Sequence, residues 1–276
     1  MTVAVLRRAD AVLHALKIRY FVTGAKARDI LLTNVFAQAA SRATRDVDVA
    51  IAVEDWNQFE AVRDALRKEE CFRPVAGMAH RFRYYADATG EGYPLDIVPF
   101  GGVEEPDMTV AWPPDRAVVM NVAGHREALE AAELVEIEPG FRVCVASVPG
   151  ITMLKLIAWA DRSKITSKDA LDIALMIRRY EDTGIGTRLY GAEFAVLESV
   201  DFDVDLAAAK LLGSDVARLA RRDTADRISA LLRDAQTRNA LIAHMAREWG
   251  AETGIDTAGR LLASFESGFE SRRVND

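Results

Sequence analysis

The segment DVDVAIAV, residues 46–53, decides the fold because acidic and branched apolar residues alternate along it. Successive side chains of a β-strand point to opposite faces of the sheet. The pattern therefore predicts a strand whose Val47, Val49 and Ile51 enter the core. Asp46 and Asp48 then project together from the other face, which gives the strand one acidic edge.

Around this strand, apolar spacing predicts mixed helices and strands up to about residue 150 and helices alone beyond it. The predicted strands are 19–24, 46–53, 80–87 and 93–101, the last two joined as a hairpin by the turn-rich ATGEG. The predicted helices are 3–16, 25–40, 56–66, 151–162 and 167–181. Prolines predict a loop over 101–114, while 127–137 and 141–148 predict a short helix with one or two edge strands.

We therefore predict an α+β fold with two domains. Residues 1–150 would form a mixed β-sheet flanked by helices, and residues 151–276 would form an α-helical domain. The predicted boundary lies near Gly150, where Pro149 and Gly150 precede the first long helix. A chain of 276 residues is long enough for two such domains.

Composition narrows the classes of function. The formal net charge of -7, from 35 basic and 42 acidic residues, argues against a nonspecific nucleic-acid binder, so RNA binding would need a local basic patch. Cys71 and Cys144 lie too far apart to suggest a disulfide framework or a zinc site. Without a signal-peptide core or a membrane-spanning stretch, we expect a cytoplasmic protein.

The paired acids indicate a metal site. Two carboxylates on one strand face repel each other unless a cation lies between them, and a hard divalent ion such as Mg²⁺ suits oxygen ligands. A third acid, Asp96 in YPLDIVPFG, would join Asp46 and Asp48 if its strand pairs beside theirs. Three carboxylates suit two ions about 3.5–4 Å apart. The alternative is two solvated acids at a strand end and an edge-strand acid at position 96.

A glycine turn precedes the acids, in FVTGAKARDILL. Gly24 and Ala25 lie at a strand-to-helix junction, where free backbone N–H groups and the helix dipole favour a triphosphate. Arg28 would reach phosphate or nucleotide, and Asp29 would order the loop by a charge-assisted hydrogen bond. The alternative is an ordinary turn before a helix.

Gly24, the DxD motif of Asp46 and Asp48, and the later LDIVPFG acid together resemble the DNA-polymerase-β-like nucleotidyltransferase superfamily. The order of motifs is similar to that of its AbiEii/AbiGii toxin-type members, through KLIAWADR and SKDALDIALMIRRY, over roughly residues 18–180. The resemblance implies a nucleotidyltransferase-type sheet and a helical domain that contributes to the active site.

The resemblance also implies a lysine and an aspartate from the helical part. The matching positions are Lys155 and Asp169, with Asp172 as a rival for Asp169. Lys155 would neutralise triphosphate charge. Arg162 follows seven residues later on the same helix face and is a further phosphate candidate. The alternatives are a lysine that extends along apolar surface to solvent and an aspartate that favours a helix N-terminus.

The implied enzyme binds an NTP with two Mg²⁺ ions and transfers NMP to a hydroxyl acceptor, releasing pyrophosphate. Asp46, Asp48 and Asp96 would be the metal ligands. The toxin-type resemblance implies a tRNA 3′ end as acceptor and a cognate antitoxin as partner. A small-molecule acceptor, as in antibiotic nucleotidyltransferases, and a catalytically silent NTP-binding module are the alternatives.

One position departs from the family pattern. The family commonly has Gly-Ser at the turn, whereas Ala25 follows Gly24 here, so no serine hydroxyl can bind phosphate. GAKARDILL is instead similar to the glycine-rich, Arg-Asp-Leu-Leu signature of CCA-adding tRNA polymerases, with a longer gap from Arg28 to Asp46. This departure affects the expected substrate more than the expected chemistry.

Overall fold

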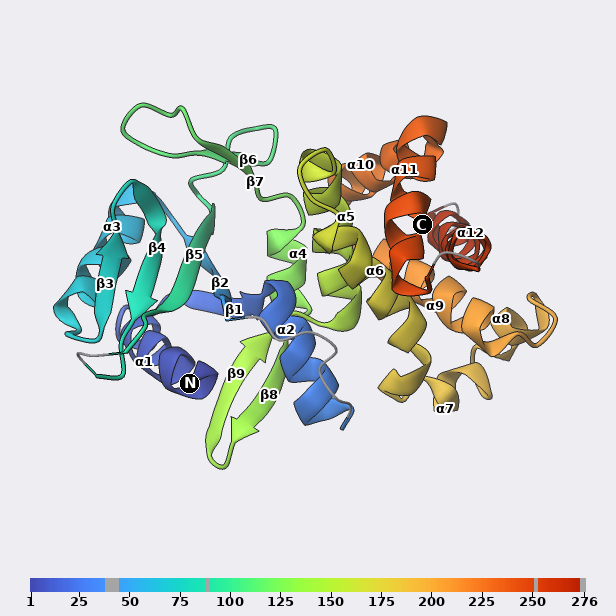
Figure 1. Ribbon diagram of the computed structural model, residues 1–276, viewed down its shortest axis with the longest axis horizontal. Coiled ribbons are helices and arrows are strands. Elements are labelled where there is room, and N and C mark those ends of the chain that lie inside the picture. The colour runs from blue at the N-terminus through green and yellow to red at the C-terminus, as the bar shows by residue number, and fades with distance from the viewer. Residues whose placement is uncertain (38–44, 88–89, 251–252, 274–276) are drawn as a thin grey trace. The chain divides into compact units, whose positions relative to one another are not determined.

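The computed structural model describes residues 1–37, 45–87, 90–250 and 253–273. The chain divides into two compact units, Met1–Ser147 and Val148–Asp276, so the division falls close to Gly150 (Figure 1). The first unit contains strands and helices, and the second is built of helices. The predicted α+β class is therefore confirmed.

A mixed sheet forms the first unit. Among the described residues, seven strands pair in the order β3-β4-β5-β2-β1-β9-β8, with β2 parallel to β5, β1 parallel to β9 and the other pairs antiparallel. The strands are β1 Arg19–Thr23, β2 Val47–Val53, β3 Phe72–Val75, β4 Met78–Tyr84, β5 Tyr93–Gly101, β8 Glu133–Glu138 and β9 Phe141–Val145. The helices are α1 Thr2–Ala15, α2 Gly24–Ile30, the π-helical η1 Leu31–Val35, α3 Trp56–Lys68 and α4 His125–Glu130.

The core of this unit lies along the central strands. Phe21, Val22, Val49 and Ile51 are at most 1% exposed. The alternation that predicted β2 holds where it matters, because Asp48 is one of its two less buried residues. Helix α1 packs against α3 and the sheet, and α2 packs against β1 and β2. Asp46 and Asp48 therefore lie at the start of a strand that is mostly buried.

Four expectations for the first unit need correction. The predicted loop 101–114 contains β6 (Thr109–Ala111), which pairs with β7 (Val119–Asn121) because a short alternating stretch lies between the prolines. Strand β9 is not an edge strand, since its parallel pairing with β1 places it inside the sheet. Strand β3 was not predicted, and its Pro74 is tolerated because β3 lies at the sheet edge. The predicted helix 25–40 ends earlier, at Val35, after the π-helical η1, and Phe36 and Ala37 are not helical; positions 38–40 lie outside the described residues.

The second unit is helical, as predicted. Its elements are α5 Val148–Arg162, α6 Lys168–Arg179, η2 Glu181–Thr183, α7 Gly186–Leu189, α8 Phe194–Glu198, α9 Val204–Leu219, α10 Arg222–Arg233, α11 Ala235–Met245, η3 Ala246–Glu248 and α12 Gly254–Arg273. Helices α9 and α12 approach closely, as the space at Gly213 shows: a Cβ atom added there would lie 2.8 Å from the carbonyl carbon of Phe265. Small residues at this contact allow the two backbones to meet.

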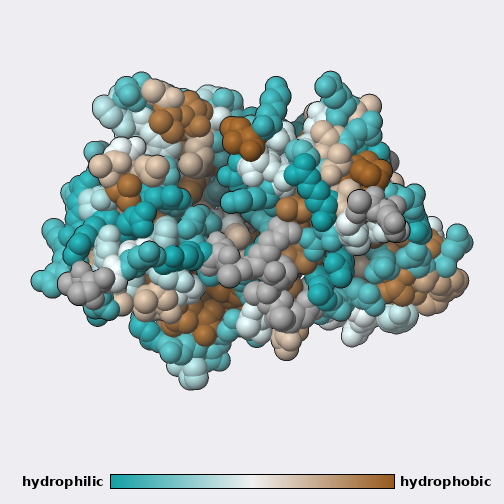
Figure 2. Space-filling view, viewed as in Figure 1, coloured by the Kyte–Doolittle hydropathy of each residue, from teal (hydrophilic) through white to brown (hydrophobic). Residues whose placement is uncertain are grey.

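Apolar residues are mostly inside each unit. The face in Figure 2 is largely hydrophilic, with apolar patches scattered over it. Of the helices that the structure describes, none has both the length and the apolar character that a membrane crossing requires.

Candidate active site

The parallel pairing of β2 and β5 brings two of the candidate acids side by side. Asp48 pairs with Asp96 in register, flanked by Val47 opposite Leu95. Paired positions on neighbouring strands project to the same face of a sheet. Asp46 directly precedes β2 and, two residues from Asp48, belongs to the same face. We refer to Asp46, Asp48 and Asp96 as the carboxylate group.

A residue that the sequence analysis missed, Arg81, lies among these acids. It stands opposite Asp96 in the antiparallel pairing of β4 and β5. Its Nε donates to Asp96 Oδ1 at 2.6 Å and its Nη2 to Asp96 Oδ2 at 2.5 Å, a two-bond ion pair. The same Nη2 lies 3.9 Å from Asp46 Oδ2.

The charges around Arg81 explain its electrostatics. Its hydrogen bonds to Asp96 contribute most, and the charges of Asp96, Asp46 and Asp48 add to them, so the pKa of Arg81 is raised above its ordinary value despite burial. All three carboxylates therefore act on this one guanidinium. The sequence predicted the hairpin but not its register, and the register that pairs Tyr84 with Tyr93 is the one that also pairs Arg81 with Asp96.

Gly24 touches the carboxylate group directly. Its φ of +68° lies in the left-handed region that favours glycine. A Cβ atom added there would overlap Asp48 Oδ2 and lie 2.9 Å from Asp48 Cγ, closer than real Cβ atoms approach other atoms. The approach follows from the pairing of Thr23, the last residue of β1, with Asp48. The glycine turn and the DxD motif thus form one structural feature.

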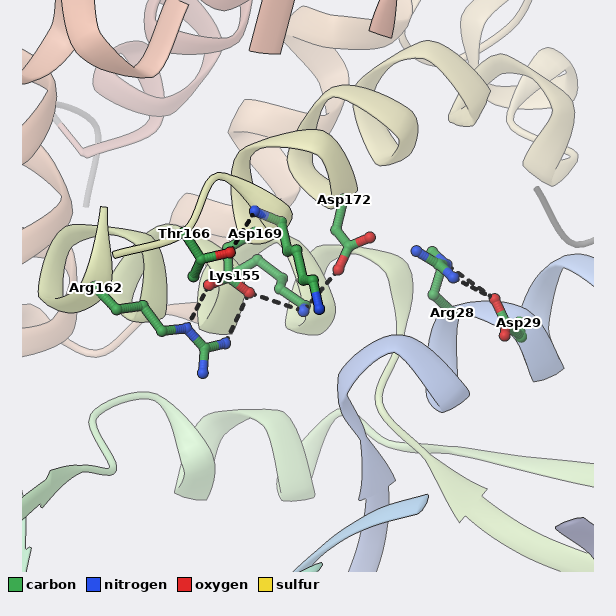
Figure 3. Close-up of polar contacts among 8 residues, drawn as sticks. Arg28, Asp29, Lys155, Arg162, Thr166, Asp169 and Asp172 are labelled. Atoms are coloured by element: carbon green, nitrogen blue, oxygen red, sulfur yellow. Dashed lines mark hydrogen bonds and ion pairs between the residues drawn. The ribbon is translucent and has the colours of Figure 1, made fainter. Parts of the chain in front are cut away.

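Arg28 and Asp29 form a buried pair on α2. Nε and Nη2 of Arg28 donate to Asp29 Oδ1 at 2.9 Å and 2.6 Å, as drawn in Figure 3. Asp29 thus forms a charge-assisted hydrogen bond, with its neighbour Arg28, and its role in ordering the loop stays a prediction. The Arg28 side chain is only 2% exposed, so a phosphate contact by Arg28 would require it to leave this position. A phosphate role for Arg28 stays a prediction.

In the second unit, four residues of α5 and α6 form a compact ion cluster, which we call the lysine cluster (Figure 3). Lys155 Nζ donates to Asp169 Oδ1 at 2.9 Å and lies 2.7 Å from Asp172 Oδ2. Arg162 adds two bonds to Asp169, 2.5 Å from Nε to Oδ2 and 2.8 Å from Nη2 to Oδ1. Asp169 and Asp172 therefore both bind Lys155, and which of them is the site acid that the resemblance implies stays a prediction.

In the lysine cluster, burial and neighbouring charges shift the pKa values in opposite directions, and the charges have the larger effect. Burial would lower the pKa of Lys155, but Asp172 and Asp169 outweigh it and raise that pKa. Burial likewise would raise the pKa of Asp169, yet Arg162 and Lys155 hold it below its usual range. Lys155 does not extend to solvent as the alternative supposed, since it is 9% exposed and ends on two acids.

The carboxylate group has the donor chemistry for a divalent cation. Carboxylate oxygens are the ligands that Mg²⁺ takes in proteins, and the overlap of an added Cβ with Asp48 shows how tightly the Gly24 turn encloses that carboxylate. Within the described ranges, however, no three acidic, histidine or cysteine side chains form a ready-made metal site. Both oxygens of Asp96 are engaged by Arg81 instead. The three side chains are of the oxygen-donor type that fits the ion, and one of them, Asp96, is bound by Arg81.

Comparison with known proteins gives one family match. Residues 30–254 match the family described as "Nucleotidyl transferase AbiEii toxin, Type IV TA system", where TA denotes toxin–antitoxin. This span includes the carboxylate group and the lysine cluster and begins after the Gly24 turn. A comparison with curated protein sequences produced no match.

Similar solved structures share low sequence identity with the chain. An antigenic nucleotidyltransferase-like protein from Paracoccidioides brasiliensis is 19% identical, covering 71% of this chain and 89% of its own, with a TM-score of 0.43. The solution structure of the antibiotic-resistance factor ANT(2'')-Ia is 16% identical, covering 72% and 96%, with a TM-score of 0.39. The crystal structure of ANT(2")-Ia with adenylyl-2"-tobramycin is 14% identical, covering 75% and 95%, with a TM-score of 0.40.

Proposed function

We propose, since this chain belongs to the AbiEii nucleotidyl transferase toxin family, that it transfers NMP from an NTP to a hydroxyl acceptor with release of pyrophosphate. The family makes the chain a nucleotidyltransferase. The observation that carries the more specific proposal is the in-register pairing of Asp48 with Asp96, with the Gly24 turn against Asp48. It gathers oxygen ligands beside a turn suited to phosphate.

The carboxylate group would hold the divalent cation, with two Mg²⁺ ions expected. When bound, such ions neutralise phosphate charge and align the reacting oxygens. In the reaction, the acceptor oxygen forms a bond to the α-phosphorus as the bond to the β-phosphate breaks, and pyrophosphate leaves. The Asp96 carboxylate would accept the hydroxyl proton. Backbone N–H groups at Gly24 and Ala25 would bind the phosphates.

The lysine cluster would supply positive charge for the triphosphate. Asp169 and Asp172 keep Lys155 protonated and fix its position. The side chain of Arg162 is 52% exposed while it remains bound to Asp169, so an anion can reach its guanidinium from solvent. The family resemblance implies an active-site role for Lys155, and we propose that Lys155 and Arg162 both act on phosphate.

The acceptor we propose is the 3′ end of tRNA, with an antitoxin encoded as partner and a cytoplasmic location. Support comes from the description of the family as a toxin of a toxin–antitoxin system. The net charge of -7 means that RNA would be held by local contacts rather than by the overall field.

Labelled NTPs with Mg²⁺ and total tRNA test the proposal. We expect the wild type to label tRNA and release pyrophosphate, and the mass change of the tRNA identifies the nucleotide. Asp46→Ala combined with Asp48→Ala should abolish transfer, and Asp64→Ala is the matched control, because Asp64 is exposed on α3 and pairs with Arg67. Equal labelling by the double variant would refute the site. Labelling of a metabolite instead of RNA would identify a small-molecule acceptor, and NTP binding without pyrophosphate release would identify a silent module.

A further inference from the structure

Arg81 contacts two acids of the carboxylate group. It binds both oxygens of Asp96, which is 8% exposed, and it faces Asp46. A buried carboxylate without a cation partner is strongly unfavourable. Arg81 therefore supplies the positive charge that is hydrogen-bonded to both oxygens of the buried Asp96 side chain.

The same two oxygens are the ones a metal would use. We propose that Arg81 is the resident counter-ion of the carboxylate group, and that a divalent cation binds by displacing its guanidinium from Asp96. This inference rests on the proposed function. It adds to that function a positioning residue, Arg81, which determines how tightly the site binds the metal. Arg81 holds Asp96 in place until the ion binds. Breaking their ion pair costs free energy, and this cost makes the binding free energy of the metal less favourable.

Two mechanisms predict different effects of Arg81→Lys on metal affinity: displacement of Arg81 by the metal, and simple charge repulsion between Arg81 and the metal. Lysine has the charge of arginine but cannot bind two carboxylate oxygens in the planar two-bond geometry. Under the proposal, Arg81→Lys holds Asp96 less well, so the metal should bind more tightly even though the net charge is unchanged. Under repulsion alone, Arg81→Lys should leave the affinity unchanged.

A third arrangement is possible chemically, in which Arg81 stays on Asp96 and orients it while the ion takes the remaining lone pairs. Arg81 would then assist the metal, and both Arg81→Lys and Arg81→Met should weaken binding. The direction of the change in affinity therefore decides between competition and assistance.

The test is a titration of the full-length protein with Mn²⁺ alone, in which electron paramagnetic resonance measures the concentration of the free ion. We expect Arg81→Lys and Arg81→Met to lower the Mn²⁺ dissociation constant about tenfold or more. Arg83→Met is the matched control, since Arg83 lies two residues away on β4 and donates to the Gly92 carbonyl oxygen. It removes the same charge from the same strand and should bind Mn²⁺ as the wild type does.

A second readout guards against loss of folding. The rise in melting temperature on adding Mn²⁺ should be larger in Arg81→Lys than in the wild type, and Arg81→Lys retains a cation for Asp96 if Arg81→Met does not fold. Unchanged or weaker Mn²⁺ binding in Arg81→Lys would overturn the inference. Asp48→Asn distinguishes failure of the Arg81 inference from failure of the proposed function. If Asp48→Asn binds Mn²⁺ as the wild type does, the metal is bound elsewhere and the proposed function itself is overturned.

Discussion

The carboxylate group and the lysine cluster are built from the same kinds of residue but differ in charge balance. In the first unit, three carboxylates lie around the guanidinium of Arg81, whereas in the second unit two carboxylates bind the two cations of Lys155 and Arg162. A balanced buried cluster holds its own structure together. The carboxylate group is instead the set of oxygen donors for which we propose a divalent cation. From this difference we expect stability to depend mainly on the lysine cluster and cation binding on the carboxylate group.

The largest expected effect is that of Lys155→Met. This change leaves Asp169 and Asp172 buried with one charge fewer between them, so the free energy of unfolding at pH 7 should fall by about 3–5 kcal/mol. Urea titration measures it, and Lys164→Met, at an exposed position, is the control. A loss below about 1 kcal/mol would mean that the cluster does not stabilise its unit.

Gly24→Ala should have the next largest effect, because it strikes the carboxylate group through the backbone. The left-handed φ costs about 1–2 kcal/mol for alanine, and moving Asp48 away from the new Cβ adds about 1–3 kcal/mol. Gly77→Ala isolates the first contribution, since Gly77 has a φ of +74° and nothing within 4 Å of an added Cβ. Equal losses in the two variants, by urea titration, would show that the Asp48 contact has no energetic effect.

Acid should destabilise the first unit before it affects the lysine cluster. Burial lowers the pKa of His125 to about 4, so the folded protein favours the neutral ring. That contribution is complete above the unfolded pKa of about 6.5 and is lost as the pH falls towards 4. Asp169, with its lowered pKa, keeps its contribution until the pH falls below about 4.

Between pH 7 and 5 the free energy of unfolding should therefore fall by about 1–2 kcal/mol, a range that allows for the partial exposure of the residue. Measurements of unfolding at both pH values in the wild type and in His125→Phe check this. The variant should lose most of the pH dependence. A variant with the wild-type slope would assign the acid sensitivity to another group.

Asp46→Asn should have the smallest effect and the opposite sign. Asp46 has a side chain 48% exposed and lies among like charges, so its neutralisation should change the metal-free stability by less than about 1 kcal/mol, towards stabilisation. Asp172→Asn, in the balanced cluster, should destabilise the protein. Thermal unfolding in EDTA compares the two. Similar losses in both variants would remove the distinction between the two regions.

Parts of both regions were predictable from local sequence. Alternation in DVDVAIAV places Asp46 and Asp48 on one face of a strand, and the seven-residue spacing of Lys155 and Arg162 places both on one face of a helix. In the structure, both of these basic residues bind Asp169. These predictions succeeded because the backbone periodicity of a single element determines which of its side chains share a face.

The sequence by itself determined most of the helices and strands, the acidic face of β2 and, through its motifs, the nucleotidyltransferase family. Only the tertiary structure decided which residues meet between elements: the interior position of β9, the approach of Gly24 to Asp48, and the binding of Asp96 by Arg81. The reason is that strand order and register depend on the packing of whole elements across long stretches of chain. The acids of the carboxylate group are visible in the sequence, but the cation that balances one of them is identified only in the folded sheet.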